Sequence, residues 1–172
     1  GKTILLVDTD LRNPSIHKRL ELDNSKGLTN YLTGQDPYES VVQNTPIPDV
    51  YVITAGPMSP NPVELLSSGR LAELFTLVDQ QAYDMIIVDM PPVLGLADAL
   101  IISNQASATI LSVAMGETKK QALTGAFKRL RQARVNIIGT VAGKAKQGTG
   151  YGYHYDYNYY GYGENNKLLE KA

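Results

Sequence analysis

The chain has 172 residues, of which 43% are hydrophobic and 19% are charged, and its formal net charge is −1. This length and composition suit one globular domain with a hydrophobic core and exclude a chain that is disordered throughout. The near-zero net charge provides no general basic field that would attract nucleic acid, and the absence of cysteine excludes disulfides and thiol catalysis.

Five short apolar runs predict the strands of a sheet. They cover residues 3–7, 50–54, 85–88, 109–113 and 135–141. Each run is apolar on both faces, as a buried parallel strand is. Apolar residues recur every three or four positions at residues 71–80 and 119–133, which is the spacing of an amphipathic helix. The alternation predicts an α/β fold with a parallel sheet flanked by helices.

The composition changes after Val141. Glycine and lysine follow first, and residues 151–162 then contain seven tyrosines among glycine and polar residues. This segment has almost no aliphatic side chain with which to form a core. We therefore expect a folded domain at residues 1–143 and a flexible tail at residues 144–172.

Aspartates directly follow two of the predicted strands. Asp8 and Asp10 come after the first strand, and Asp89 comes at the end of a later strand, just before Pro91 and Pro92. In open α/β sheets, ligands bind at the carboxyl ends of the strands. Carboxylates there can hold Mg²⁺ and accept a proton from an attacking hydroxyl, as phosphoryl transfer requires. The alternative is that Asp8 and Asp89 only cap turns or helix starts.

The order of these motifs resembles that of the bacterial tyrosine kinases of the capsule and exopolysaccharide type. Asp8-x-Asp10-x-Arg12 is similar to the second Walker A motif of that family, and the strand that ends at Asp89 is similar to its Walker B strand. Three further segments follow the family pattern, namely Asn13-Pro14-Ser15-Ile16-His17, Gly27-Leu28-x-x-Tyr31-Leu32-x-Gly34 and Asn61-Pro62-x-Glu64-Leu65-Leu66. The resemblance covers about residues 1–143 and implies a three-layer fold like that of P-loop NTPases.

The resemblance also implies roles for the residues after the first strand. Asp8 would accept the proton of the tyrosine hydroxyl. Asp10 and Asp89 would organise Mg²⁺, partly through water. Arg12 would orient these carboxylates or contact a phosphate of ATP.

Further roles follow from the same resemblance. Asp89, Pro91 and Asp98 would lie at the nucleotide. Asp98 falls in a helix after the proline turn, so it is either a nucleotide sensor or an ordinary aspartate at a helix start. Asn61, Pro62 and Glu64 would be structural and lie at a contact between subunits.

In this family, tail tyrosines are the sites of autophosphorylation. Each phosphate adds about −1.5 to −2 charges, so several of them would turn the tail into a polyanion and could break a subunit contact by repulsion. The alternative is an aromatic segment that self-associates. The candidate acceptors are Tyr151, Tyr153, Tyr155, Tyr157, Tyr159, Tyr160 and Tyr162.

The chain departs from the family pattern at two places. Gly1, Lys2 and Thr3 imitate the end of a phosphate-binding loop, but an aliphatic strand follows them where that loop must open a helix, so we reject this interpretation. We expect the true loop upstream, which leaves the domain without its first strand, loop and first helix. In the family that strand is central, so its loss would separate residues 85–88 from 109–113 or force them to pair. Relatives also commonly have a base-recognising asparagine where this chain has Gly143.

Basic residues crowd the helix that we predict at residues 119–133. They line either a solvated face or a surface that contacts an anionic neighbour, such as another subunit or a phosphorylated tail. They are Lys119, Lys120, Lys128, Arg129, Arg131 and Arg134.

The leading hypothesis is an ATP- and Mg²⁺-dependent tyrosine autokinase that phosphorylates its tail between subunits of a ring. It would regulate the polymerisation and export of capsular polysaccharide at the cytoplasmic face of the bacterial inner membrane. A membrane activator segment and a tyrosine phosphatase would be its partners. The alternatives are a truncated or degenerate non-catalytic regulatory module and a deviant-Walker ATPase that positions cell machinery.

Overall fold

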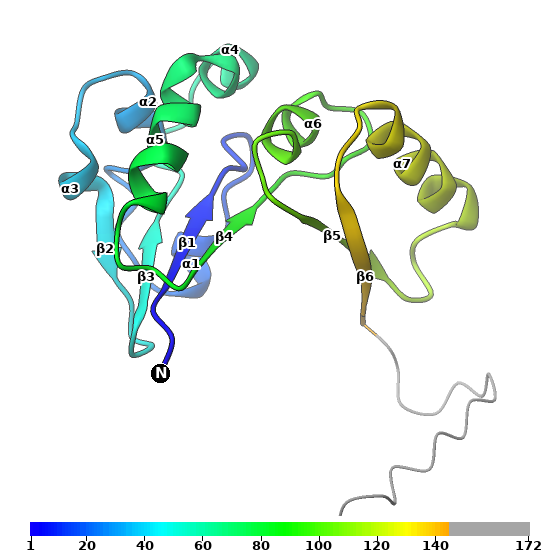
Figure 1. Ribbon diagram of the computed structural model, residues 1–172, viewed down its shortest axis with the longest axis horizontal. Coiled ribbons are helices and arrows are strands. Elements are labelled where there is room, and N and C mark those ends of the chain that lie inside the picture. The colour runs from blue at the N-terminus through cyan, green and yellow to red at the C-terminus, as the bar shows by residue number, and fades with distance from the viewer. Residues whose placement is uncertain (145–172) are drawn as a thin grey trace, which may run out of the picture.

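The computed structural model describes residues 1–144, in which strands and helices alternate (Figure 1). The strands are β1 (Ile4–Asp8), β2 (Val42–Asn44), β3 (Val50–Ile53), β4 (Met85–Asp89), β5 (Thr109–Ala114) and β6 (Ile137–Gly143). The helices are α1 (Ile16–Arg19), α2 (Leu28–Leu32), α3 (Tyr38–Val41), α4 (Pro62–Ser67), α5 (Gly69–Asp79), α6 (Asp98–Ser103) and α7 (Lys120–Gln132). The predicted α/β fold is confirmed. None of these helices is long and apolar enough to cross a membrane.

The strands form two separate sheets. The larger sheet has the order β2-β3-β1-β4, in which β1 is parallel to β3 and β4 while β2 is antiparallel to β3. β5 and β6 pair in parallel as a second sheet. β4 and β5 are therefore not paired, which is one of the two outcomes expected if the family's central strand is missing. The antiparallel β2 was not predicted, because a strand of three residues is too short to show a pattern.

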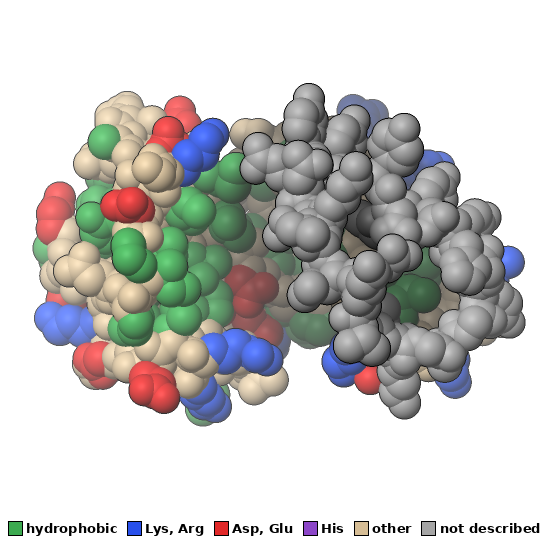
Figure 2. All heavy atoms as spheres, turned by 90° about the horizontal axis from the view of Figure 1, so that it is seen from below, with side chains coloured by type: hydrophobic (Ala, Val, Ile, Leu, Met, Phe, Trp, Pro, Cys, Tyr) green, Lys and Arg blue, Asp and Glu red, His purple; other side chains and the backbone are tan. Residues whose placement is uncertain are grey.

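The strands on either side of this separation keep apolar side chains at the surface. Met85 and Ile87 of β4 are 49% and 43% exposed, and Ile110 of β5 is 54% exposed. Figure 2 shows hydrophobic side chains at the surface of the lobe on the left, which contains the larger sheet. Strands inside a parallel sheet are normally covered on both faces. The exposure therefore marks an uncovered edge in the part of the chain that the structure describes.

The hydrophobic core lies between the larger sheet and the helices beside it. Leu5 and Val7 of β1 belong to the same buried cluster as Leu71, Leu74 and Val78 of α5. The three α5 residues are three and four positions apart, so they lie on one face of the helix. That face packs toward the sheet and fixes β1 in the middle of the fold.

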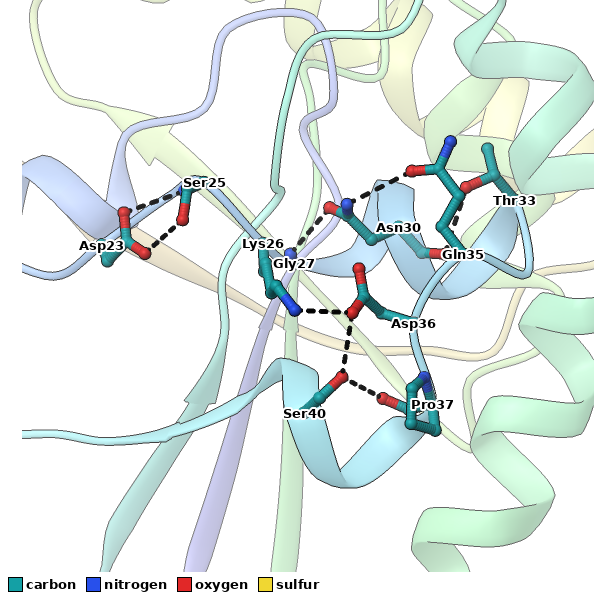
Figure 3. Close-up of polar contacts among 10 residues, drawn as sticks. All are labelled: Asp23, Ser25, Lys26, Gly27, Asn30, Thr33, Gln35, Asp36, Pro37 and Ser40. Atoms are coloured by element: carbon teal, nitrogen blue, oxygen red, sulfur yellow. Dashed lines mark hydrogen bonds and ion pairs between the residues drawn. The ribbon is translucent and has the colours of Figure 1, made fainter.

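A polar network lies within the segment between α1 and α3 (Figure 3), and the Leu28 amide joins this segment to the Thr54 carbonyl oxygen just after β3 at 2.7 Å. The Gly27 amide donates to Asn30 Oδ1 at 3.1 Å, and Lys26 Nζ donates to Asp36 Oδ1 at 2.8 Å. Gly27 lies so close to the residues after β3 that a Cβ atom there would stand 2.2 Å from the Thr54 carbonyl oxygen. Only glycine fits at this approach.

We predict that Gly27→Ala lowers the free energy of unfolding by about 2 kcal/mol or more, because the added methyl group would meet backbone atoms of Thr54 and Gly56 at 2.2 and 2.4 Å. Urea unfolding followed by circular dichroism measures the change. Gly69→Ala is the matched control. No atom lies within 4 Å of a Cβ added at Gly69, which begins α5, so its stability should be unchanged or slightly raised. Equal effects at the two positions would contradict the packing argument.

Candidate active site at the carboxyl ends of β1 and β4

The two acidic strand ends lie side by side because β1 and β4 are paired in parallel. The register places Asp8 opposite Asp89. Thr9 joins the strands beyond this pair, since its backbone amide and its hydroxyl both donate to the Asp89 carbonyl oxygen, at 3.0 and 2.5 Å. The role of Thr9 was missed in the sequence. Its position between two aspartates at a strand end was the one available signal.

Asp8 is completely buried, and its carboxylate organises the loop that follows β1. Oδ1 accepts a hydrogen bond from the Asp10 amide at 3.2 Å, and Oδ2 accepts one from the Ile16 amide at 3.3 Å. Burial raises the pKa of Asp8, these backbone hydrogen bonds partly offset the rise, and the charge of Asp89 adds to it. Ile16 is the first residue of α1, so the expected alternative, a helix-start aspartate, describes part of what Asp8 does.

Asp10 and Asp89 are the more accessible carboxylates of this edge. Asp10 is partly exposed, and its Oδ1 accepts from the amides of Arg12 and Asn13 at 3.2 and 3.0 Å. Asp89 is exposed as a residue, yet the protein around its carboxylate removes enough water to raise its pKa. The charge of Asp10 raises that pKa further, and Arg19 partly offsets the rise. Two repelling carboxylates at one edge are an arrangement that a divalent cation relieves.

Arg19 was also missed in the sequence. It is exposed on α1, a helix of four residues that gives no usable periodic signal. Its influence on the pKa of Asp89 places a positive charge at the acidic edge. The edge therefore combines three carboxylates with at least one nearby cation.

The guanidinium of Arg12 pairs with Asp98 rather than with Asp8 or Asp89. Its Nε donates to Asp98 Oδ2 at 2.7 Å, and its Nη2 donates to Asp98 Oδ1 at 3.4 Å. Asp98 is the first residue of α6 and is 1% exposed. The roles expected for Arg12, toward the strand-end carboxylates or toward a phosphate of ATP, stay a prediction. Its side chain ties the loop after β1 to α6, and only its backbone amide contacts Asp10.

Arg12 also lies next to the segment at residues 61–64, which is far from it in the sequence. It lines a cavity of about 410 Å³ together with Asn61, Pro62 and Glu64. Pro62 is buried at the first position of α4, whereas Asn61 and Glu64 are exposed. The segment expected at a subunit contact thus adjoins the loop of the candidate site.

Two further residues singled out in the sequence, Pro91 and Gly143, lie in the turn after β4 and at the end of β6. Pro91 is buried in the turn after β4. Gly143 ends β6, where an added Cβ would meet nothing closer than the Val113 carbonyl oxygen at 4.0 Å, so the fold has room for an asparagine side chain there. The seven candidate tyrosines lie outside the described residues.

Comparison with known proteins identifies the family. The chain is 38% identical over 146 residues to the tyrosine-protein kinase YwqD of Bacillus subtilis, an alignment that covers 85% of this chain. It is 36% identical over 150 residues, 87% of its length, to the putative tyrosine-protein kinase in the cps region of Klebsiella pneumoniae. The kinase domain of the Escherichia coli tyrosine kinase ETK matches 92% of this chain with a TM-score of 0.81 and 33% identity. The chain belongs to the bacterial tyrosine kinase family.

This bacterial tyrosine kinase chain spans only part of its relatives. It covers 61% of the Bacillus protein, 21% of the Klebsiella protein and 62% of the ETK kinase domain. No protein-family model matches it. The septum site-determining protein MinD of Pyrococcus horikoshii matches with a TM-score of 0.67 at 23% identity, which shows the shared P-loop NTPase-like fold alone.

We predict that Asp89→Asn raises the thermal midpoint at about pH 7.5, because the neutral amide removes the cost of desolvating a charge and the repulsion with Asp10. The pKa of Asp89 is raised in the folded chain, so the folded state binds this proton more tightly than the unfolded state. Ionised Asp89 therefore lowers stability above its folded pKa, and the loss vanishes as the pH falls toward the unfolded value of about 4. Thermal unfolding at stepped pH should show the advantage of the variant fading with acid.

The matched control is Asp79→Asn, which removes one exposed negative charge outside this edge. It should leave the pH dependence of wild type in place. An Asp89→Asn advantage that grew toward acid, or that Asp79→Asn reproduced, would contradict the assigned repulsion.

Proposed function

We propose that this chain supplies the metal-holding and proton-accepting side of an ATP-dependent protein-tyrosine kinase, and that the tyrosines at residues 151–162 are its acceptors. One observation carries the proposal: the in-register pairing of β1 and β4 brings Asp8, Asp10 and Asp89 to one sheet edge. Membership of the bacterial tyrosine kinase family supports tyrosine as the acceptor. In open α/β sheets this edge is where ligands bind.

The residues of the edge fit a Mg²⁺ ion that is bound together with a nucleotide. In phosphoryl-transfer sites Mg²⁺ takes one or two carboxylates from the protein and its other ligands from phosphates and water. No three Asp, Glu, His or Cys side chains in residues 1–144 form a group that could hold a metal ion by themselves. Asp10 and Asp89 would hold the ion directly or through water. When bound, the ion neutralises the charge on the phosphate oxygens.

Asp8 is the proposed acceptor of the tyrosine hydroxyl proton. A raised pKa makes this carboxylate a stronger base than a solvated aspartate. Because Asp8 is completely buried and its oxygens are held by the amides of Asp10 and Ile16, the role requires the loop at Asp10 to shift when the acceptor binds. Arg12 and the buried Asp98 limit that shift from the other end of the loop. Asp98 would then influence the nucleotide indirectly, through its ion pair with Arg12.

The loop that grips the phosphates must come from elsewhere. Gly1, Lys2 and Thr3 lead directly into β1, which confirms that they do not open a helix. We propose that a segment outside these residues supplies a strand, the loop and a helix. That strand would cover the exposed apolar side chains along β4 and β5.

The wider role is proposed on the same basis. Copies of the whole protein would form a ring in which one copy phosphorylates the tail of another, with Asn61, Pro62 and Glu64 at the contact. The exposure of Asn61 and Glu64 supports this placement. The Klebsiella relative is named for its cps region, which supports a role in capsular polysaccharide polymerisation and export. A membrane activator at the cytoplasmic face of the inner membrane and a tyrosine phosphatase complete the proposal.

A non-catalytic regulatory module is the second candidate, and Gly143 favours it. Glycine has no side chain with which to recognise the base, although the fold has room for one. A positioning ATPase is less well supported, since the likeness to MinD extends to the fold alone. Kinase activity of the whole protein separates these candidates.

We predict that the whole protein, incubated with Mg²⁺ and ATP, acquires phosphotyrosine within residues 151–162. Asp8→Asn should lower the initial rate by roughly 10²-fold or more, since it removes the proton acceptor. Asp10→Asn and Asp89→Asn should raise the Mg²⁺ concentration needed for half-maximal rate. Quantitative mass spectrometry of the tail measures each rate.

Asp79→Asn is again the control, and it should retain the wild-type rate. Phosphate found only on serine, phosphate absent from residues 151–162, or equal rates in wild type and Asp8→Asn would each overturn the proposed mechanism.

A further inference from the structure

The solvent-facing side of α7 carries positive charge without any compensating acid. Lys120, Lys128 and Arg131 lie on one side of the helix and are exposed, while Ala126 and Leu130 on the other side are buried. Lys119 and Arg134 flank the helix and are also exposed. These five cations are called the α7 cationic face below. After Glu117 the sequence contains no Asp or Glu until Asp156.

The α7 cationic face has no anionic partner within residues 1–144. The three ion pairs found there lie elsewhere. Arg129 differs from the other α7 cations, because its Nη2 donates to the Leu96 carbonyl oxygen at 2.7 Å and so faces the protein. Like charges spaced along a helix face destabilise it by a few tenths of a kcal/mol per pair. An anion bound at this face would remove that repulsion.

The last described residues before the tyrosine-rich segment contact the loop that precedes α7. The Met115 amide donates to the Gly143 carbonyl oxygen at 2.9 Å, and Lys144 Nζ pairs with Glu117 Oε2 at 2.8 Å. Glu117 lies three positions before the start of α7, so residue 144 lies beside the loop that leads into that helix. The chain that continues toward the tyrosine-rich segment therefore leaves the described residues near the loop before α7.

The residues between Lys144 and the tyrosine-rich segment set how far that segment can extend from the described fold. The seven residues from 145 to Tyr151 can span about 24 Å when extended. α7 has 13 residues and is therefore about 20 Å long. This connection is comparable in length with the helix, so residues 151–162 can reach α7 without unfolding any described element.

We propose that the α7 cationic face binds residues 151–162 of this same chain once their tyrosines are phosphorylated, an inference that rests on the proposed function. Before phosphorylation the segment carries one formal negative charge, that of Asp156. Each phosphotyrosine adds about −1.5 to −2 charges and three acceptor oxygens. Lysine meets such a group as a point charge, and arginine binds it through two parallel hydrogen bonds. Binding at α7 holds the product tail away from the active site, which frees that site for another acceptor.

The test uses the full chain with its seven tail tyrosines replaced by phenylalanine, so that its own tail cannot be phosphorylated. Fluorescent synthetic peptides of residues 148–164 are titrated with this protein, and anisotropy gives the dissociation constants. One peptide carries phosphotyrosine at positions 153, 155 and 157, and the other carries none. The phosphopeptide should bind at least roughly tenfold more tightly, and the difference should shrink as salt is raised.

Lys120→Glu/Lys128→Glu should weaken phosphopeptide binding by roughly tenfold or more. Lys2→Glu/Lys18→Glu is the matched control, because it changes the net charge equally at two exposed lysines outside α7. It should stay within about twofold of the parent protein. Lys120→Arg/Lys128→Arg should retain binding, which separates the effect of charge from damage to the helix. Equal weakening by the two Glu variants would overturn the inference.

The peptides are made by synthesis, so this result does not depend on kinase activity. A chain that binds the phosphopeptide through α7 but shows no kinase activity overturns the proposed function alone. Failure of the phosphopeptide to bind more tightly than the unphosphorylated one overturns this inference alone. Vesicles of phosphatidylglycerol and phosphatidylcholine are titrated in parallel. If Lys120→Glu/Lys128→Glu abolishes vesicle binding and leaves phosphopeptide binding intact, the face is a membrane contact and the inference is wrong.

Discussion

Asp8 and Asp89 face each other because β1 and β4 run parallel and in register over five residue pairs, from Ile4 with Met85 to Asp8 with Asp89. Buried Leu5 and Val7 anchor β1 in the core, and a slip of one residue would turn both side chains to the opposite face. The two hydrogen bonds from Thr9 to the Asp89 carbonyl oxygen hold the register at the point where it matters for the site. The positions of the acidic side chains follow from this strand pair.

The loop after β1 fixes the positions of the acidic side chains at this edge of the sheet. The Asp8 carboxylate accepts hydrogen bonds from the amides of Asp10 and Ile16, and the Asp10 carboxylate accepts one from the Arg12 amide. The Arg12 side chain pairs with buried Asp98 and so ties this loop to α6. Burial raises the pKa of both Asp8 and Asp89, the charge of Asp89 adds to the rise at Asp8, and the charge of Asp10 adds to the rise at Asp89. Keeping these carboxylates ionised therefore opposes folding. Groups that are held together at such a cost are commonly found at functional sites. The same loop adjoins the cavity beside Asn61 and Glu64, so the proposed subunit contact would lie next to the site.

The strands and helices whose residues show a clear apolar run or helical spacing were predicted from the sequence. The apolar run at 85–88 became β4, and the helical spacing at 71–80 became α5, each within two residues of its observed ends. The aspartates at the strand ends were predicted because each directly follows an apolar run, and the carboxyl ends of parallel strands lie at one edge of the sheet. The bonds from Thr9 to Asp89 and from Arg12 to Asp98 join residues 80 and 86 positions apart, so no local pattern could assign them. The antiparallel β2 likewise depends on its partner β3 and not on its own three residues.

The central claim is that Asp10 and Asp89 form one cation site at the carboxyl ends of β1 and β4. Paramagnetic Mn²⁺, a substitute for Mg²⁺, tests it most directly when it is titrated into the isotope-labelled full chain during nuclear magnetic resonance. The account predicts that amide signals of residues 8–13 and 89–91 broaden first, and that Asp10→Asn and Asp89→Asn each remove the effect. Broadening centred on another acidic segment, such as that around Asp23 and Asp36, or broadening at residues 8–13 that survives both substitutions, would contradict it.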